Sequence, residues 1–140
     1  MSIEEFIEKM NALIKDRYRE YVVYAYLFGS VVEGRATRES DIDVALRFYD
    51  HVSDRERFRV FKELLAIIDE DIDLVDLSKA SIVLRMDVYS RGRIIYCSDR
   101  EALFRDQLAT LKKFDDFRFI ARWFKKRMVN DIERMFSKEI

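Results

Sequence analysis

Residues 27–46 read LFGSVVEGRATRESDIDVAL, and the rest of the chain is interpreted around this stretch. A Gly-Ser pair, Gly29 and Ser30, follows an apolar run, and Asp41 and Asp43 come after ten further residues. Side chains alternate between the two faces of a strand, so both aspartates are expected on one face, about 6.6 Å apart along the chain. Because hard divalent cations prefer carboxylate oxygen, this pattern predicts a metal site.

The stretch resembles the minimal nucleotidyltransferase (MNT) family of the nucleotidyltransferase (DNA polymerase beta-like) superfamily. An Asp-x-Asp alone is usually a solvated strand end and a Gly-Ser pair alone is usually a turn, but their order and spacing are specific together. The matching positions are Gly29, Ser30, Gly34, Ser40, Asp41 and Asp43. The resemblance implies an α/β (α+β) fold, a small mixed sheet of about four strands flanked by helices. Helices are expected on one face of the sheet and the acid-bearing cleft on the other.

A third strand-like run, residues 71–77, carries another candidate ligand. Alternation places Asp73 on the face opposite to Ile72 and Leu74, and it places Asp76 on the face opposite to Asp73. A charge within a strand is costly unless it is paired or bound to metal. The resemblance implies that Asp73 is the third catalytic carboxylate, whereas the alternative is a solvated aspartate on an edge strand.

The resemblance also implies a role for each acid. Asp41 and Asp43 would bridge two Mg²⁺ ions, and Asp73 would hold the ion nearest the acceptor. Two such ions can activate an attacking oxygen and neutralise a leaving one. The substrate is expected to be ATP.

A second group of residues is predicted to bind the nucleotide. Gly29 and Ser30 are expected at a helix N-terminus, where free backbone N–H groups favour phosphate. Ser40 and Arg35 are assigned to the same nucleotide site, and Arg38 is a further cation of this loop.

Composition narrows the class of protein. The 140 residues predict one domain, 1–140, with a helical C-terminal part, 98–140. A hydrophobic fraction of 49% with 38% charged residues is typical of a globular protein. No apolar run is long enough for a membrane span and no signal peptide is expected, and a net charge of −1 argues against direct nucleic-acid binding. A single cysteine, Cys97, fits a cytoplasmic location.

Capping boxes and apolar spacing predict the helices. The capping pairs are Ser2 with Glu5, Ser53 with Glu56, and Ser98 with Glu101. The buried stripe of the second helix is expected to be Phe58, Phe61, Leu64, Leu65 and Ile68. A helix over residues 79–91 is expected to bury Ile82, Val83 and Met86 and to end at Gly92. In the strand that follows, adjacent Ile94 and Ile95 predict cover on both faces.

The C-terminal apolar stripe continues to Met135, and one helix of that extent would be about 57 Å long. Either the helix breaks near Asp115-Asp116, or part of its stripe contacts another chain. We expect its outer part to form a homo- or hetero-oligomer contact through Phe124, Met128, Ile132 and Met135.

The family resemblance implies a nucleotidyltransferase antitoxin. Such an enzyme would transfer AMP from ATP to a tyrosine hydroxyl of a HEPN-domain toxin and thereby neutralise it. Three alternatives stay open: an antitoxin that acts by binding only, a nucleotidyltransferase with a small-molecule acceptor, and a structural or metal-binding module without catalysis.

Overall fold

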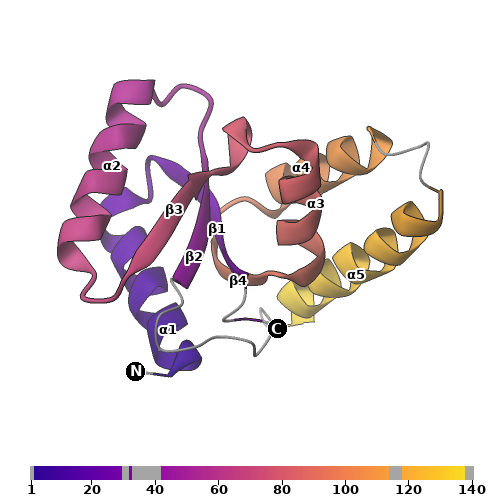
Figure 1. Ribbon diagram of the computed structural model, residues 1–140, viewed down its shortest axis with the longest axis horizontal. Coiled ribbons are helices and arrows are strands. Elements are labelled where there is room, and N and C mark those ends of the chain that lie inside the picture. The colour runs from indigo at the N-terminus through magenta and orange to yellow at the C-terminus, as the bar shows by residue number, and fades with distance from the viewer. Residues whose placement is uncertain (1, 30–31, 33–41, 114–117, 138–140) are drawn as a thin grey trace.

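The computed structural model describes residues 2–29, 32, 42–113 and 118–137. Its sheet has the strand order β3-β2-β1-β4. The strands are β1 (Val22–Phe28), β2 (Ile42–Phe48), β3 (Ile72–Asp76) and β4 (Arg93–Cys97). β1 pairs antiparallel with β2 and with β4, whereas β2 and β3 are parallel (Figure 1). The predicted small mixed sheet is therefore confirmed.

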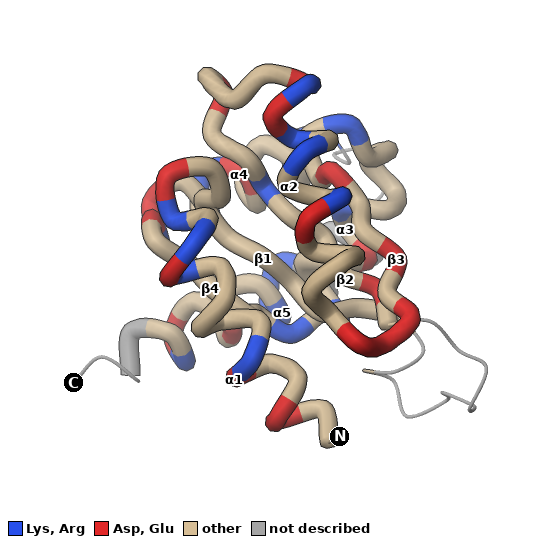
Figure 2. Tube along the Cα trace, turned by 90° about the vertical axis from the view of Figure 1, so that its left-hand side faces the viewer, with Lys and Arg blue, Asp and Glu red and all other residues tan. Residues whose placement is uncertain are grey.

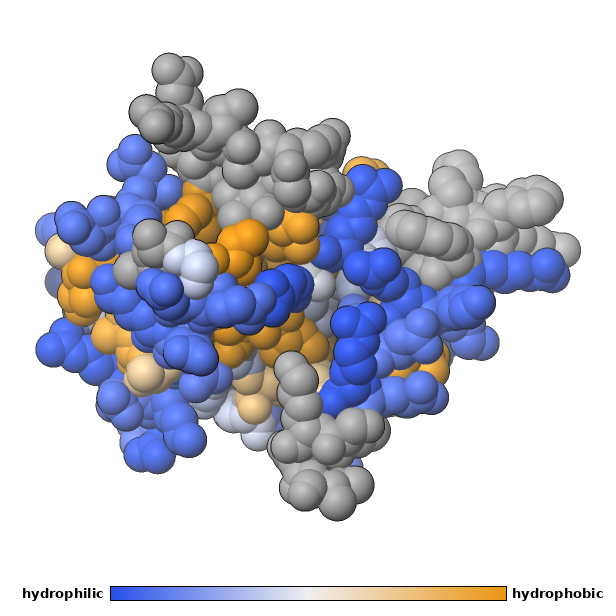
Figure 3. All heavy atoms as spheres, turned by 90° about the horizontal axis from the view of Figure 1, so that it is seen from below, coloured by the Kyte–Doolittle hydropathy of each residue, from blue (hydrophilic) through white to orange (hydrophobic). Residues whose placement is uncertain are grey.

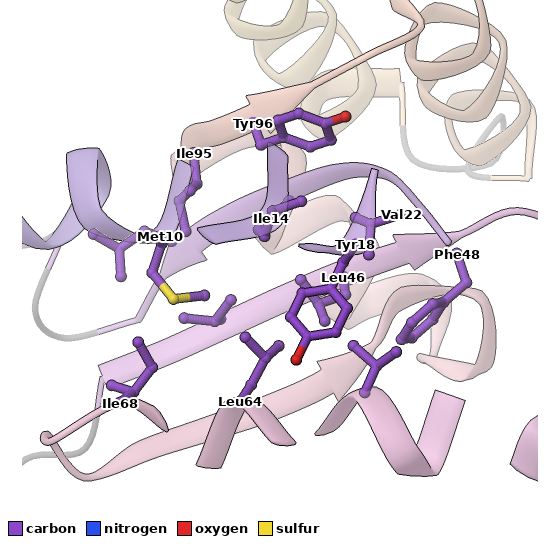
Figure 4. Packing of buried hydrophobic residues seen from close by; sticks show 14 of the residues in the cluster. Met10, Ile14, Tyr18, Val22, Leu46, Phe48, Leu64, Ile68, Ile95 and Tyr96 are labelled. Carbon is purple, nitrogen blue, oxygen red and sulfur yellow. The ribbon is translucent and has the colours of Figure 1, made fainter. Parts of the chain in front are cut away.

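Two N-terminal helices cover one face of the sheet. α1 (Ile3–Leu13) continues into a π-helical turn (Ile14–Tyr18), and α2 is Asp54–Ile67. Side chains from both helices meet the sheet in one apolar cluster (Figure 4). Members of this cluster include Phe6, Met10, Ile14, Val60, Leu64, Val44, Leu46, Phe48 and Ile95.

Three further helices cover the opposite face: α3 (Ile82–Arg91), α4 (Arg100–Lys112) and α5 (Arg118–Ser137). They pack on a second cluster that includes Tyr24, Tyr26, Ala45, Met86, Tyr89, Leu103 and Met128. The expectation of helices on one face only is thus wrong. Every residue of β1 is buried, so both faces of the sheet require cover. The adjacent Ile95 and Ile94 pack on the first and second clusters respectively, as predicted for β4.

Two of the three predicted helix starts are confirmed. Ser2 caps α1 by accepting a hydrogen bond from the Glu5 backbone N–H, and Ser53 and Glu56 form a complete capping box. The third is wrong, because Asp99 caps α4. Ser98 instead donates its backbone N–H and its hydroxyl to the Val23 carbonyl, extending the pairing of β4 with β1.

The predicted stripes are correct in part. Val60 and Leu64 are buried on α2, whereas Phe58 is 68% and Leu65 52% exposed. Phe58 and Val60 are two residues apart, which is about 200° around a helix, so they face opposite directions. On α3, Met86 is buried but Val83 is 71% exposed, which corrects the prediction that Val83 points inward.

Part of the C-terminal stripe, Met128 and Met135, packs on the chain's own sheet. α4 ends at Lys112 and α5 begins at Arg118, so the long helix is divided where a break was expected, although residues 114–117 lie outside the described part. Met128 is 3% exposed within the second cluster, and Met135 packs against that cluster. The expectation that Met128 contacts another chain is therefore wrong. Within the described residues, no helix has the combined length and apolar character of a membrane span.

Candidate functional site

Two of the predicted acids lie next to each other at one end of the sheet. In the parallel pairing of β2 with β3, Asp43 is the register partner of Asp73. Figure 2 shows acidic residues on the neighbouring tubes of β2 and β3. Register partners on parallel strands point to the same face, and neighbouring strands are about 4.8 Å apart. Ile42 and Ile72 both pack on the α1–α2 side, so the two aspartates leave the opposite face of the sheet. This confirms the predicted face of each acid.

Solvent access differs between the two carboxylates. Asp43 is half-buried and Asp73 is exposed. Together they present carboxylate oxygens from adjacent strands toward solvent, a donor set that fits a hard cation such as Mg²⁺. Among the described residues no group of three potential metal ligands is found, and Asp41 lies outside them.

Gly29 lies directly against the carboxylate of Asp43. Phe28, the last residue of β1, pairs with Asp43, and Gly29 follows with φ of +84°, a conformation that favours glycine. A Cβ on Gly29 would overlap the Oδ2 atom of Asp43. The glycine therefore allows the chain to turn directly against a carboxylate of the site.

Several predicted site residues lie outside the described part of the chain. They are Ser30, Gly34, Arg35, Arg38, Ser40 and Asp41. Their assignment to nucleotide or metal binding remains a prediction.

Two other polar residues are placed away from the site. Asp76 points to the α2 side of the sheet, where its Oδ2 accepts a hydrogen bond from Arg57 Nη1 at 3.1 Å. His51 lies in the turn after β2, at the far end of that strand from Asp43, and its ring stacks on Tyr49. The placement of Asp76 agrees with the sequence prediction.

The structure contains a buried polar network that no sequence pattern predicted. The Tyr24 hydroxyl donates to Asp106 Oδ2 at 2.7 Å, and Arg47 Nε donates to the same oxygen at 3.0 Å. The Tyr89 hydroxyl lies 2.8 Å from that of Tyr24, to which it can donate. Burial raises the pKa of the Tyr89 hydroxyl to about 12. The network joins β1, β2, α3 and α4, and the long separations along the chain left no local signal.

Comparison with known proteins places this geometry in a family. The family model described as "Polymerase beta, Nucleotidyltransferase" matches residues 8–101, from α1 to the first turn of α4. Protein adenylyltransferase MntA of Shewanella oneidensis is 36% identical over 87 residues, which are 62% of this chain and 60% of that protein. The aligned part thus spans less than two thirds of this relative.

Solved structures share the fold over most of the chain. A toxin–antitoxin crystal structure with AMP-PNP superposes with a TM-score of 0.60 at 28% identity, covering 91% of this chain and 98% of that chain. A tri-AMPylated HEPN toxin of Shewanella oneidensis in complex with MNT antitoxin gives a TM-score of 0.55 at 25% identity, covering 94% and 99%. With the family model matching over half of its residues, this chain belongs to the polymerase beta nucleotidyltransferase family.

Proposed function

We propose that this chain is an antitoxin enzyme that transfers AMP from ATP to a tyrosine hydroxyl of a cognate HEPN toxin, neutralising the toxin. The observation that carries the proposal is the pairing of Asp43 with Asp73 directly beside the Gly29 turn. The similarity to a protein adenylyltransferase, and to a toxin–antitoxin complex with an AMPylated HEPN toxin, supports this reaction and this partner.

The proposed reaction is a displacement at the α-phosphorus of ATP. The tyrosine oxygen forms a bond to that phosphorus, while the bond from the phosphorus to the bridging oxygen breaks. Pyrophosphate leaves with the electron pair, and the hydroxyl proton passes to solvent or to the carboxylate of Asp73. Asp73 is exposed, so an acceptor presented by another protein can reach it.

The carboxylates are proposed to hold the metal. Asp43 and Asp73 would supply ligands together with Asp41, and we propose two Mg²⁺ ions. Nucleotidyltransferases of this family generally use ATP and Mg²⁺. When bound, such ions polarise phosphoryl oxygens and make a hydroxyl more acidic. Asp43 and Asp73 on rigid, paired strands would fix the ligand positions before substrate arrives.

The turn after β1 is proposed to receive the phosphates. Gly29 lets the backbone approach the Asp43 carboxylate closely, so phosphate oxygens bound at this turn would lie beside the metal ligands. Ser30, Ser40 and Arg35 are the proposed side-chain contacts to the nucleotide. We also propose a cytoplasmic location for the protein, because ATP is the proposed donor.

Mass spectrometry of the partner tests the proposal. The chain would be co-expressed with a candidate HEPN partner, and the mass of the purified partner would be measured intact and after digestion. With the wild-type chain we expect AMP on a tyrosine of the partner. With the Asp43→Asn variant we expect the partner to remain unmodified.

Other results would identify other functions. A partner that is bound and inhibited but never modified would indicate an antitoxin that acts by binding alone. AMP transfer to small molecules only would indicate a different acceptor class.

A further inference from the structure

A second feature of the same sheet end is an arginine-lined pocket of about 330 Å³ between β4 and α5. Arg91, Arg93, Arg127 and Arg134 line it together with Asp131. Pockets of this volume are at the small end of the range for small-molecule sites. We refer to it as the arginine pocket.

Strand pairing places the arginine pocket near the acids. Arg93, the first residue of β4, pairs with Leu27 of β1, and the next residue, Phe28, pairs with Asp43 of β2. Because β4 is two strands from β2, about 10 Å separates the start of β4 from Asp43. A phosphate chain that begins at Asp43 can therefore extend toward the pocket across the end of β1.

Four arginines and one aspartate line the pocket, so its lining favours an anion. Arg93 is engaged by Glu4, with N–O distances of 2.8 and 3.0 Å, and Arg91 lies 3.6 Å from Asp87. Arg127 is attracted to Asp131 but forms no hydrogen bond or short ion pair with any described residue. Seen from below, the α5 side of the molecule is mostly hydrophilic, whereas the other side carries hydrophilic side chains together with most of the apolar surface (Figure 3). Guanidinium groups bind phosphate through paired hydrogen bonds.

Asp131 limits this positive charge. Its Oδ1 lies 3.5 Å from an Arg134 nitrogen, its side chain is 12% exposed, and its Oδ2 is buried without a hydrogen-bond partner. Burial raises the pKa of Asp131, while Arg134 and Arg127 oppose the rise. The carboxylate is thus poorly satisfied, and its main effect on an anion in the pocket is repulsion.

We propose that the arginine pocket binds the phosphate groups of the donor nucleotide that lie beyond the reacting phosphorus. Arg127 and Arg134 of α5 are the principal contacts, and Asp131 sets the strength of binding. The inference rests on the proposed function, because that function supplies the nucleoside triphosphate. The confined volume favours a polyphosphate over an acidic protein segment.

Calorimetric titration of the full chain with ATP, AMP and inorganic tripolyphosphate, each with Mg²⁺, tests the proposal. Arg127→Ala and Arg134→Ala should each raise the Kd for ATP and for tripolyphosphate about tenfold, with AMP affected little. Asp131→Asn should lower both Kd values. Lys126→Ala is the matched control, since Lys126 is an exposed cation of α5 outside the pocket, and it should leave binding unchanged.

Circular dichroism would verify that all variants keep the fold. Unchanged tripolyphosphate and ATP binding in the two arginine variants would overturn the proposal. Loss of binding to the HEPN partner with ATP binding intact would also overturn it, and would assign the pocket to a protein interface. Polyphosphate binding that follows the predicted order, in a chain that transfers no AMP, would uphold the pocket and reject the enzymatic function.

Discussion

Asp43 and Asp73 are register partners on the parallel strands β2 and β3, so the sheet itself sets the spacing of the two carboxylates. Neither acid depends on a loop for its position. A shift of one residue in this pairing would carry Asp73 to the α2 side of the sheet, away from Asp43. The strand register is therefore as important to the site as the identity of the acids.

Gly29→Ala is predicted to damage the site through Asp43. The new Cβ would overlap the Asp43 carboxylate, and the positive φ of +84° would cost alanine about 1–2 kcal/mol. AMP transfer should fall at least tenfold, while the unfolding free energy falls by about 2 kcal/mol. The stability cost should shrink in an Asp43→Ala background, because the clash is then removed. An equal cost in both backgrounds, measured by urea denaturation, would contradict this account.

Asp76→Ala is predicted to affect stability and to spare transfer. Asp76 pairs with Arg57 at 3.1 Å where both side chains are 12% exposed or less, and it caps the turn that starts at Leu77 through the Ser78 backbone N–H. Removing one partner of such a buried pair costs about 3 kcal/mol. Transfer should be measured well below the new melting temperature. A loss of transfer comparable with that of Asp73→Ala would show that the faces of β3 are assigned wrongly.

Met128→Ala is predicted to destabilise the isolated chain. Met128 is 3% exposed in the second cluster, so its truncation should cost about 2–4 kcal/mol. Its neighbour Val129 is 40% exposed, and Val129→Ala should cost less than 1 kcal/mol. Thermal unfolding of the two purified variants measures the difference. Equal stability of both variants would mean that Met128 does not belong to the intramolecular core.

The folded protein is predicted to lose stability at high pH, as the Tyr89 hydroxyl ionises. Its pKa is raised to about 12 in the fold, against about 10 for an ordinary tyrosine, because burial disfavours the charged form. The folded protein then holds this proton more tightly than the unfolded chain. The contribution is complete below pH 10 and is lost as the pH rises through 12, at most about 2.7 kcal/mol.

Urea denaturation of the wild type and Tyr89→Phe between pH 9 and 12 measures this contribution. The variant should lose less stability over that interval than the wild type. Identical pH dependence of the two proteins would contradict the assignment.

Local patterns in the sequence were sufficient to place Asp43 and Asp73 on the same face of the sheet. Alternation along a strand placed Asp43 opposite to Ile42 and Asp73 opposite to Ile72, because side-chain direction in a strand follows from backbone geometry alone. The capping box at Ser53 was found for the same reason, since it involves only residues three apart.

Features that depend on tertiary packing could not be read in this way. The apolar residues of α2 lie on more than one face of the helix. The sequence therefore could not show that Val60 rather than Phe58 packs against the sheet. The contact of Met128 with the second cluster depends on how α5 folds back onto the sheet. The hydrogen bond from Tyr24 to Asp106 spans 82 positions and has no local pattern.

The rate of AMP transfer from ATP to the HEPN partner, measured with Mg²⁺ for matched aspartate variants, tests the central claim most directly. Asp43→Asn and Asp73→Asn should each lower the rate about 1,000-fold, because each removes a carboxylate ligand of the proposed Mg²⁺ ions. The positive charge of these ions would stabilise the transition state by several kcal/mol. Asp50→Asn is the control, an exposed acid beyond the far end of β2, and it should transfer at the wild-type rate. Wild-type transfer by either Asp43→Asn or Asp73→Asn would contradict the account.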